Sequence, residues 1–245
     1  MAGEDVAQAF VGFAGLMGDR AFAFVRTPGP KGFPWHTGRE QEDLVLFHPH
    51  FREPGAATLP PDIEKTFKMP PGVNPIYPDE GAFEIDVATP DGRTLPLRSA
   101  ELKAVIERRA GYAVTLRFSE RSLYDCRPVS LFGNASARGL EDDAMPIDRR
   151  RFRANLYVDW AEDRPYREDD LVGRTLQIGE RLRLAVLERD PRCKMITIDP
   201  DTGQTEPRIL RHVTKAHEGM AGVYAAVLVE GVVRQGDPIH LILQE

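Results

Sequence analysis

The sequence predicts a mainly β protein, built as a β-barrel or a sandwich, with a few short helices. The first observation is a series of short strand-like segments after residue 171, at 176–178, 182–187, 195–198, 223–229 and 239–243. The second is that turn sequences separate them, such as Asp-Pro-Asp-Thr-Gly at 199–203 and Gln-Gly-Asp-Pro at 235–238. Short strands at this spacing favour an all-β architecture over a doubly wound parallel sheet.

Length and charge set the broad class of the protein. The 245 residues suffice for one large or two modest domains, and we place a boundary near residue 115, between 1–115 and 116–245. A formal net charge of -6 provides no overall field that would draw nucleic acid or anionic lipid. Neither a membrane-spanning apolar run nor a signal peptide is recognisable, so we expect a cytoplasmic protein with free thiols at Cys126 and Cys193.

The N-terminal part contains a mixture of strands and irregular segments. Phe22 and Phe24 alternate with alanines, which predicts a strand over 20–26 that ends in a Thr-Pro-Gly-Pro turn. Residues 31–52 predict an irregular stretch with one further strand. Within it, Pro49 favours a solvated loop for the two flanking histidines over a metal-binding strand. Seven prolines between residues 54 and 78 exclude a helix or a central strand there.

The middle of the chain gives clearer signals. Alternation over 83–97 around a Thr-Pro-Asp-Gly-Arg turn predicts a β-hairpin. Ser99 is suited to cap a helix whose apolar side is formed by Leu102, Val105 and Ile106, and Gly111 follows its end. A strand over 114–118 and a short helix within 134–143 come next.

Residues 151–158 read as a strand with an unusual polar face. Arg151, Arg153, Asn155 and Tyr157 alternate with apolar side chains. Guanidinium groups bind phosphate in a bidentate manner and an amide offers a further donor, so this face is a candidate anion site. A solvated outer face of a barrel explains the same pattern equally well.

Cys193 is the best single candidate for chemistry. It lies where a loop enters a predicted strand over 194–199, and Arg189, Arg192 and Lys194 are close in sequence. Cations beside a thiol favour the thiolate, which acts as a nucleophile or as a soft metal ligand. The alternative is a free cysteine that packs as a small apolar residue. The chain has no Gly-rich phosphate loop, H-E-x-x-H or G-x-S-x-G motif and no histidine spacing typical of a metal site.

Several motifs together resemble one family. They are R-F-R-A-N at 151–155, the segment 166–179, R-C at 192–193 with D-P-D-T-G at 199–203, and the segments 221–224 and 231–239. In this order they resemble the MOSC domain, and the chain is similar to the mitochondrial amidoxime-reducing components and their bacterial relatives. The motifs at 18–25 and 83–85 resemble the N-terminal β domain that accompanies MOSC. The resemblance implies a MOSC-type barrel plus a smaller N-terminal β domain.

The resemblance also implies a cofactor, a reaction and a set of residues. In the family, the cysteine that corresponds to Cys193 is the protein thiolate on the molybdenum of the molybdenum cofactor (molybdopterin). The positions implied to hold the phosphate and pterin are Arg20, Ser136, Arg153 and Asn155, with Arg192, Thr197 and Tyr224 beside the metal or pterin. Such enzymes reduce N-hydroxylated or similar N-oxygenated small molecules with electrons from a separate carrier protein. From the charge and hydropathy of this chain we expect neither nucleic acid nor a membrane as a partner.

Three further expectations follow from these residues. Family members begin with a strand ending in Y-P-V-K-S, whose Lys and Ser help to hold the phosphate, whereas this sequence starts M-A-G-E where that strand would end. We therefore expect the first strand of the N-terminal domain to be missing. An electropositive thiol also suits a sulfur carrier with a Cys193 persulfide. A module that binds the cofactor without turnover is the third possibility.

Overall fold

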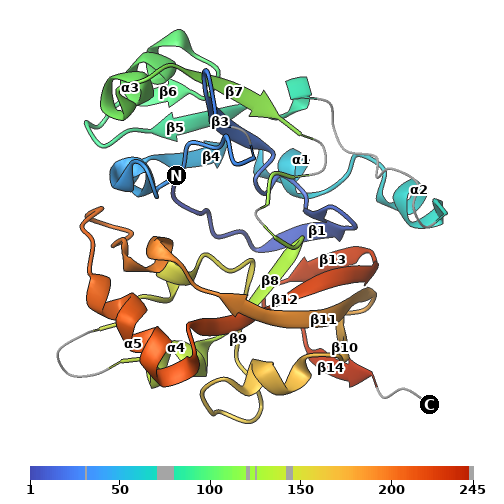
Figure 1. The fold of residues 1–245 in the computed structure, drawn as a ribbon. Coiled ribbons are helices and arrows are strands. Elements are labelled where there is room, and N and C mark those ends of the chain that lie inside the picture. The colour runs from blue at the N-terminus through green and yellow to red at the C-terminus, as the bar shows by residue number, and fades with distance from the viewer. Residues whose placement is uncertain (31, 71–79, 120–121, 125, 142–145, 243–245) are drawn as a thin grey trace.

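The computed structural model of the chain consists mostly of strands, with a few short helices (Figure 1). The structure describes residues 1–245 apart from 31, 71–79, 120–121, 125, 142–145 and 243–245. In Figure 1 the N-terminal β region lies above and the C-terminal sheet below. The predicted fold class is confirmed.

A curled six-stranded sheet forms the C-terminal part, in the order β14-β10-β11-β12-β8-β9. Its strands are β8 (Val129–Gly133), β9 (Leu156–Val158), β10 (Thr175–Ile178), β11 (Leu182–Pro191), β12 (Met220–Val229) and β14 (Ile239–Ile242). All neighbours are antiparallel except β8 and β9, which are parallel. Register shifts interrupt the pairing of β11 with β12, and such bulges bend long strands. The sheet therefore curls around a core that includes Leu131, Leu184 and Val223.

The first strands of the chain pair with one of the last. β1 (Gln8–Gly12) lies between β2 (Gly15–Leu16) and β13 (Gly231–Arg234) in a three-stranded sheet. The register pairs Phe10 with Val232, and Phe10 is fully buried. Residues 8–16 thus lie against the C-terminal part, and in Figure 1 β1 lies directly above β13. The domain boundary near residue 115 stays a proposal.

The N-terminal region holds two small sheets and the capped helix. β3 (Phe22–Arg26) pairs with β7 (Val114–Phe118), and β5 (Ile85–Ala88) pairs with both β4 (His48–Phe51) and β6 (Thr94–Pro96). The predicted strands over 20–26 and 114–118 and the predicted hairpin are therefore confirmed. Helix α3 (Ala100–Ala110) is confirmed in detail, because the Ser99 hydroxyl accepts from the Leu102 amide at 3.1 Å and Gly111 is left-handed with φ 76°.

Two predictions for the N-terminal region are wrong. His48 and His50 belong to the strand β4, which is possible because β4 is an edge strand and Pro49 interrupts no central ladder. The proline-rich stretch also contains helices, α1 (Pro54–Thr58) and α2 (Ile63–Lys68). Pro54 occupies the first turn of α1, where a missing amide costs nothing, and the next prolines fall between the two helices. Short 3-10 helices η1 (Glu42–Leu46) and η2 (Glu80–Ala82) complete this region.

The C-terminal part also departs from the predicted elements. Only the end of 151–158 is a strand, because η3 (Arg149–Phe152) precedes it and Arg153 is left-handed with φ 53°. The predicted strand at 195–198 is instead the 3-10 helix η5 (Lys194–Thr197), and η4 (Arg167–Leu171) precedes β10. The short helix expected within 134–143 is α4 (Asn134–Gly139).

Helix α5 (Pro207–His217) was not predicted. Glu206 caps it by accepting from the Arg208 amide, and Pro207 occupies its first turn. Ile209 and Val213 bury one side of the helix in a core shared with Phe132, Phe152 and Ala221. Within the described residues no helix is long and apolar enough to cross a membrane.

Candidate functional site

Cys193 stands at the junction between the end of β11 and the start of η5. Its thiol is free and half-buried. The Arg39 guanidinium donates to the sulfur, with an Nη2 to Sγ distance of 3.5 Å. Arg39 belongs to the N-terminal part of the chain, so both parts contribute to the surroundings of the thiol.

The cations next to Cys193 in sequence do not surround the sulfur as expected, because each has an acidic partner. Arg192 pairs with Asp190 at 2.7 Å, Arg189 with Glu218 at 2.6 Å and Lys194 with Glu42 at 2.5 Å. Arg192 still interacts electrostatically with Cys193, but its Nε and Nη1 donate to the carbonyls of Ala221 and Phe152. The cation in contact with the thiol is therefore one that sequence proximity could not identify.

A short segment before η1 holds Arg39 in place. The Lys194 ammonium donates to the Arg39 carbonyl at 3.0 Å, and the Arg39 guanidinium lies 5.1 Å from the centre of the Phe33 ring. Gly38 packs so closely on the Met195 side chain that an added Cβ would lie 2.9 Å from its terminal carbon. Close packing and a backbone hydrogen bond thus fix this segment over the loop that carries Cys193.

A second group of polar side chains gathers where the turn after β2 meets the start of β9. The Asn155 amide donates to Asp19 Oδ2 at 2.8 Å, Arg20 also pairs with Asp19, and Arg20 donates to the Arg153 carbonyl at 3.3 Å. Arg153 donates to the Met1 carbonyl at 3.1 Å. Both arginines have left-handed backbones, with φ 50° and 53°. The structure therefore brings Arg20, Arg153 and Asn155 together, and Asp19 is a member that the sequence did not reveal.

Asn155 is fixed by a reciprocal contact with β8. The backbone N–H of Asn155 donates to the Ser130 hydroxyl. The side-chain oxygen of Asn155 accepts from the backbone N–H and from the hydroxyl of Ser130, at 3.0 Å each. This leaves the side-chain amide group directed at Asp19. Asn155 is thus held as a donor facing an anion, which is the role a phosphate oxygen would require.

Arg192 links this group to the thiol. Its guanidinium donates to the carbonyl of Phe152 at 2.8 Å, and Phe152 directly precedes Arg153. The residue that follows Arg192 in the chain is Cys193.

Asp190, which is 3% exposed, accepts from Arg192 and from the Tyr224 hydroxyl. Burial raises the pKa of Asp190 to about 6 against the opposing effects of Arg192, Tyr224 and Arg20. Burial likewise raises the pKa of Tyr224, and Asp190 adds to that shift.

Two predicted residues make their contacts elsewhere. The Ser136 hydroxyl donates to Glu168 at 2.8 Å and accepts from the Tyr166 amide at 2.8 Å. Ser136 is fully buried, so these contacts fix α4 and do not face the group around Arg153. The Thr197 hydroxyl donates to the Lys194 carbonyl at 2.7 Å and stabilises η5. The structure therefore does not join Ser136 to the proposed phosphate-binding group.

Arg151 is separated from Arg153 and has a structural role. Its side chain is 8% exposed and donates to the Thr197 carbonyl at 3.1 Å and to Asp199 at 2.5 Å. Asp199 in turn accepts from the amides of Asp201 and Thr202. Arg151 thus ties the Asp-Pro-Asp-Thr-Gly turn to η5 and fixes the far end of the loop that begins at Cys193.

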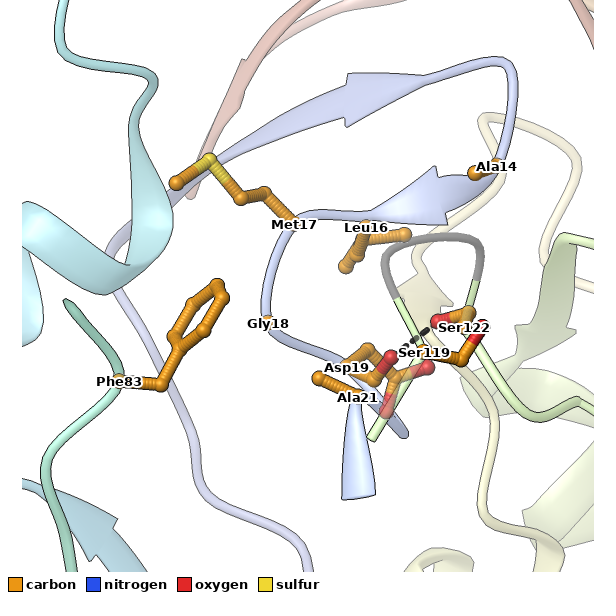
Figure 2. Close-up of a pocket in the computed structure, with 9 residues that line it drawn as sticks. All are labelled: Ala14, Leu16, Met17, Gly18, Asp19, Ala21, Phe83, Ser119 and Ser122. Carbon is orange, nitrogen blue, oxygen red and sulfur yellow. Dashed lines mark hydrogen bonds between the residues drawn. The ribbon is translucent and has the colours of Figure 1, made fainter. Parts of the chain in front are cut away.

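A small cavity lies behind the turn that carries Asp19 and Arg20 (Figure 2). Its volume is about 10 Å³, which is room for one water molecule. Figure 2 shows Phe83 and Met17 on one side of it and the Ser122 hydroxyl donating to the Asp19 carbonyl on the other. The cavity is too small for a ligand, and the Ser122 contact holds the turn in position.

The donor groups suit a phosphorylated cofactor with a soft metal. In the described residues no three His, Cys, Asp or Glu side chains gather as a metal-binding set, and Cys193 offers a free, half-buried thiol. A thiolate is a soft ligand, and two guanidinium groups with an amide match the oxygens of a phosphate. In the structure Asp19 accepts from the Asn155 amide and pairs with Arg20, while the Arg153 guanidinium donates to the Met1 carbonyl.

Comparison with known proteins agrees with the motifs. A family model described as MOSC domain matches residues 119–240. The chain is similar to YiiM from Geobacillus stearothermophilus, at 19% identity over 48% of this chain and 55% of that one, with a TM-score of 0.38. It is also similar to the YUAD protein from Bacillus subtilis, at 18% identity over 54% and 70% of the two chains, with a TM-score of 0.37.

The chain spans about half the length of YiiM, with 55% of that protein covered. No curated protein matches the sequence. The matched family region contains β8 to β13, and with them Cys193, Arg153 and Asn155, whereas Arg20 and Arg39 precede it. The chain thus belongs to the MOSC domain family, with its MOSC domain over residues 119–240.

Proposed function

We propose that this protein binds a molybdenum cofactor through Cys193 and reduces N-hydroxylated or similar N-oxygenated small molecules with electrons from a separate carrier protein. The observation that supports this most is a half-buried free thiol in contact with the Arg39 guanidinium at 3.5 Å. Arg192 connects that thiol through the Phe152 carbonyl to the group formed by Arg20, Arg153 and Asn155. These contacts support the proposal that Cys193 is the metal ligand and that Arg20, Arg153 and Asn155 hold the phosphate.

Each residue has a definite task in this proposal. The Cys193 sulfur would be the protein ligand of the metal, and Arg20, Arg153 and Asn155 would hold the cofactor phosphate. The Arg39 guanidinium donates a hydrogen bond to the sulfur and would hold it in position for ligation. The bound cofactor would supply two-electron redox chemistry.

The proposed reaction has a simple balance. The N–O bond of the substrate breaks, the nitrogen keeps the bonding pair and gains a proton, and the oxygen leaves as water. One turnover consumes two electrons and two protons, and the electrons come from a reduced carrier protein. The described residues contain no cysteine cluster for an iron–sulfur centre, which agrees with an external donor.

Anaerobic turnover tests the proposal. Protein from a host that makes the cofactor is mixed with benzamidoxime and reduced methyl viologen, and benzamidine is measured by liquid chromatography. We expect benzamidine from the wild type and from Cys126→Ser, the matched control for the other, exposed thiol, but none above background from Cys193→Ser. Turnover that is unchanged in Cys193→Ser contradicts the proposal, and so does a wild type that contains molybdenum but produces no benzamidine.

The same thiol favours one second candidate, a sulfur carrier. A half-buried cysteine beside a guanidinium group can accept sulfur from the persulfide of a cysteine desulfurase and hold it as its own persulfide. Mass spectrometry of the protein after incubation with a desulfurase and cysteine distinguishes the two functions. One added sulfur atom on Cys193 supports the function as a sulfur carrier, and an unmodified Cys193 rules that function out.

A further inference from the structure

A cleft of about 680 Å³ runs along one side of α5. Its opposite wall is formed by Glu42 from η1 and Lys194 from η5. In Figure 1 α5 lies at the outer side of the C-terminal part. The volume is within the range of about 300–1,000 Å³ that is typical of small-molecule sites.

The cleft carries positive charge without a matching carboxylate. Glu42 is already bound to Lys194 at 2.5 Å, so these two charges offset each other. Arg211 and Lys215 lie one turn apart on α5, and neither makes an ion pair within the described part of the chain. Glu206 is bound to Arg208 at 2.8 Å and acts on Arg211 only at longer range. Two cations therefore face the cleft in a protein whose net charge is -6.

Apolar groups lie beside these cations. Pro207 and Leu210 line the cleft from the same helix, and Leu210 is half-buried. A ligand that fits both features has an apolar body and an anionic group. A carboxylate is the simplest such group, since a guanidinium binds it with two parallel hydrogen bonds.

The cleft shares a wall with the surroundings of Cys193. Lys194 directly follows Cys193, and its ammonium group donates to the carbonyl of Arg39, whose guanidinium reaches the sulfur. We propose that this cleft binds the substrate, and that the substrate is an N-oxygenated molecule with an apolar body and a carboxylate held by Arg211 and Lys215. This inference rests on the proposed reductase function.

Direct binding tests the inference without turnover. The probes are 4-carboxybenzamidoxime and neutral benzamidoxime, titrated into the purified protein by calorimetry at low and high salt. We expect the carboxylate probe to bind at least about tenfold tighter at low salt, because charge-assisted hydrogen bonds are about twice as strong as neutral ones. The advantage should fall as salt screens the exposed cations.

Charge removal on α5 provides the matched comparison. The double variant Arg211→Ala with Lys215→Ala should lose the preference for the carboxylate probe and keep its affinity for the neutral one. Arg208→Ala, on the same helix but outside the cleft lining, should behave as the wild type. Circular dichroism confirms that each variant is folded, and the single variants Arg211→Gln and Lys215→Gln replace the double variant if it is not.

The outcomes separate this inference from the proposed function. The proposal that the cleft binds a substrate carboxylate is overturned by equal affinity for both probes. It is also overturned if the preference for the carboxylate probe survives in the charge-removed variants. Selective binding of the carboxylate probe to a protein that never takes up molybdenum supports the cleft as a site and refutes the reductase. Reduction of benzamidoxime without any carboxylate preference supports the reductase and refutes the cleft.

Discussion

At the scale of single residues, the thiol takes its contacting cation from far away in the sequence. Arg39 and Cys193 are 154 positions apart, yet the guanidinium lies 3.5 Å from the sulfur. The adjacent Lys194 and nearby Arg189 are bound to carboxylates. The cation in contact with this cysteine therefore comes from tertiary structure and not from its neighbours in sequence.

Replacement of Arg39 should slow the reaction of Cys193 with an alkylating agent. In a Cys126→Ser background, Arg39→Ala removes the guanidinium that contacts the sulfur, and we expect the rate of reaction with iodoacetamide to fall about threefold to tenfold. The rate is followed by mass spectrometry at neutral pH. Arg189→Ala is the control, since Arg189 pairs with Glu218, and a rate that falls in this variant but not in Arg39→Ala contradicts the assignment.

Asp190 should make stability depend on pH. Burial raises its pKa in the folded protein to about 6, from 3.8 in the unfolded chain, so the folded state binds more protons between these values. The free energy of unfolding must therefore fall as the pH rises through this window, by about 1–3 kcal/mol in total. Urea titrations from about pH 3 to about pH 7 extend beyond both pKa values and measure the slope.

The variant Asp190→Asn isolates this carboxyl group. It should be less stable overall, since Arg192 is left buried without its partner, and the part of the pH slope due to Asp190 should vanish. Asp159→Asn, at an exposed carboxylate, should keep the slope of the wild type. An unchanged slope in Asp190→Asn would show that another group titrates.

Which site residues the sequence could reveal depends on how they are held. The structure brings Arg20, Arg153 and Asn155 together, although the strand that was to align Arg151 and Arg153 is broken by the left-handed backbone at Arg153. Ser136 hydrogen-bonds elsewhere because a buried carboxylate, Glu168, competes for its hydroxyl. No local sequence pattern predicts a hydrogen-bond partner that is this distant in sequence.

At the scale of elements, local capping and alternation were sufficient where both were present. Helix α3 and the β5–β6 hairpin follow directly from the cap at Ser99 and the alternation of apolar residues. The segment at 195–198 alternates in the same way, yet it forms η5. There the Thr197 hydroxyl donates to the Lys194 carbonyl and the Arg151 guanidinium donates to the Thr197 carbonyl, contacts that hold a helical turn. Periodicity alone does not distinguish a short strand from a short helical turn.

Glu168 should be the main support of α4. Its carboxylate is fully buried and accepts from the Gly133 amide, the Ser136 hydroxyl and the Trp160 indole. Glu168→Gln replaces one acceptor oxygen by a donor, so at least one of these groups loses its partner. We expect a loss of about 1–3 kcal/mol in the free energy of unfolding, measured by urea titration.

An exposed carboxylate nearby serves as the control for that substitution. Glu162 has a side chain that is 59% exposed and pairs only with surface arginines. Glu162→Gln should change the free energy of unfolding by less than about 0.5 kcal/mol. Equal losses in the two variants would contradict the assigned role of Glu168.

At the scale of the whole molecule, the candidate site requires both parts of the chain. β1 pairs with β13, and this places Asp19 and Arg20 beside Asn155. The segment before η1 places Arg39 over Cys193. The sequence indicated a mainly β fold and a cysteine-centred site, but the junction between the two parts arises from long-range pairing that no local pattern encodes.

Molybdenum content is the most direct test of the central claim. The wild type, Cys126→Ser and Cys193→Ser are produced in a host that makes the cofactor, and metal per chain is measured by elemental analysis. Cys193 ligation predicts that the wild type and Cys126→Ser approach about one equivalent, while Cys193→Ser falls below about a tenth. A wild type below about a tenth of an equivalent, or a Cys193→Ser variant that retains as much molybdenum as the wild type, would contradict it.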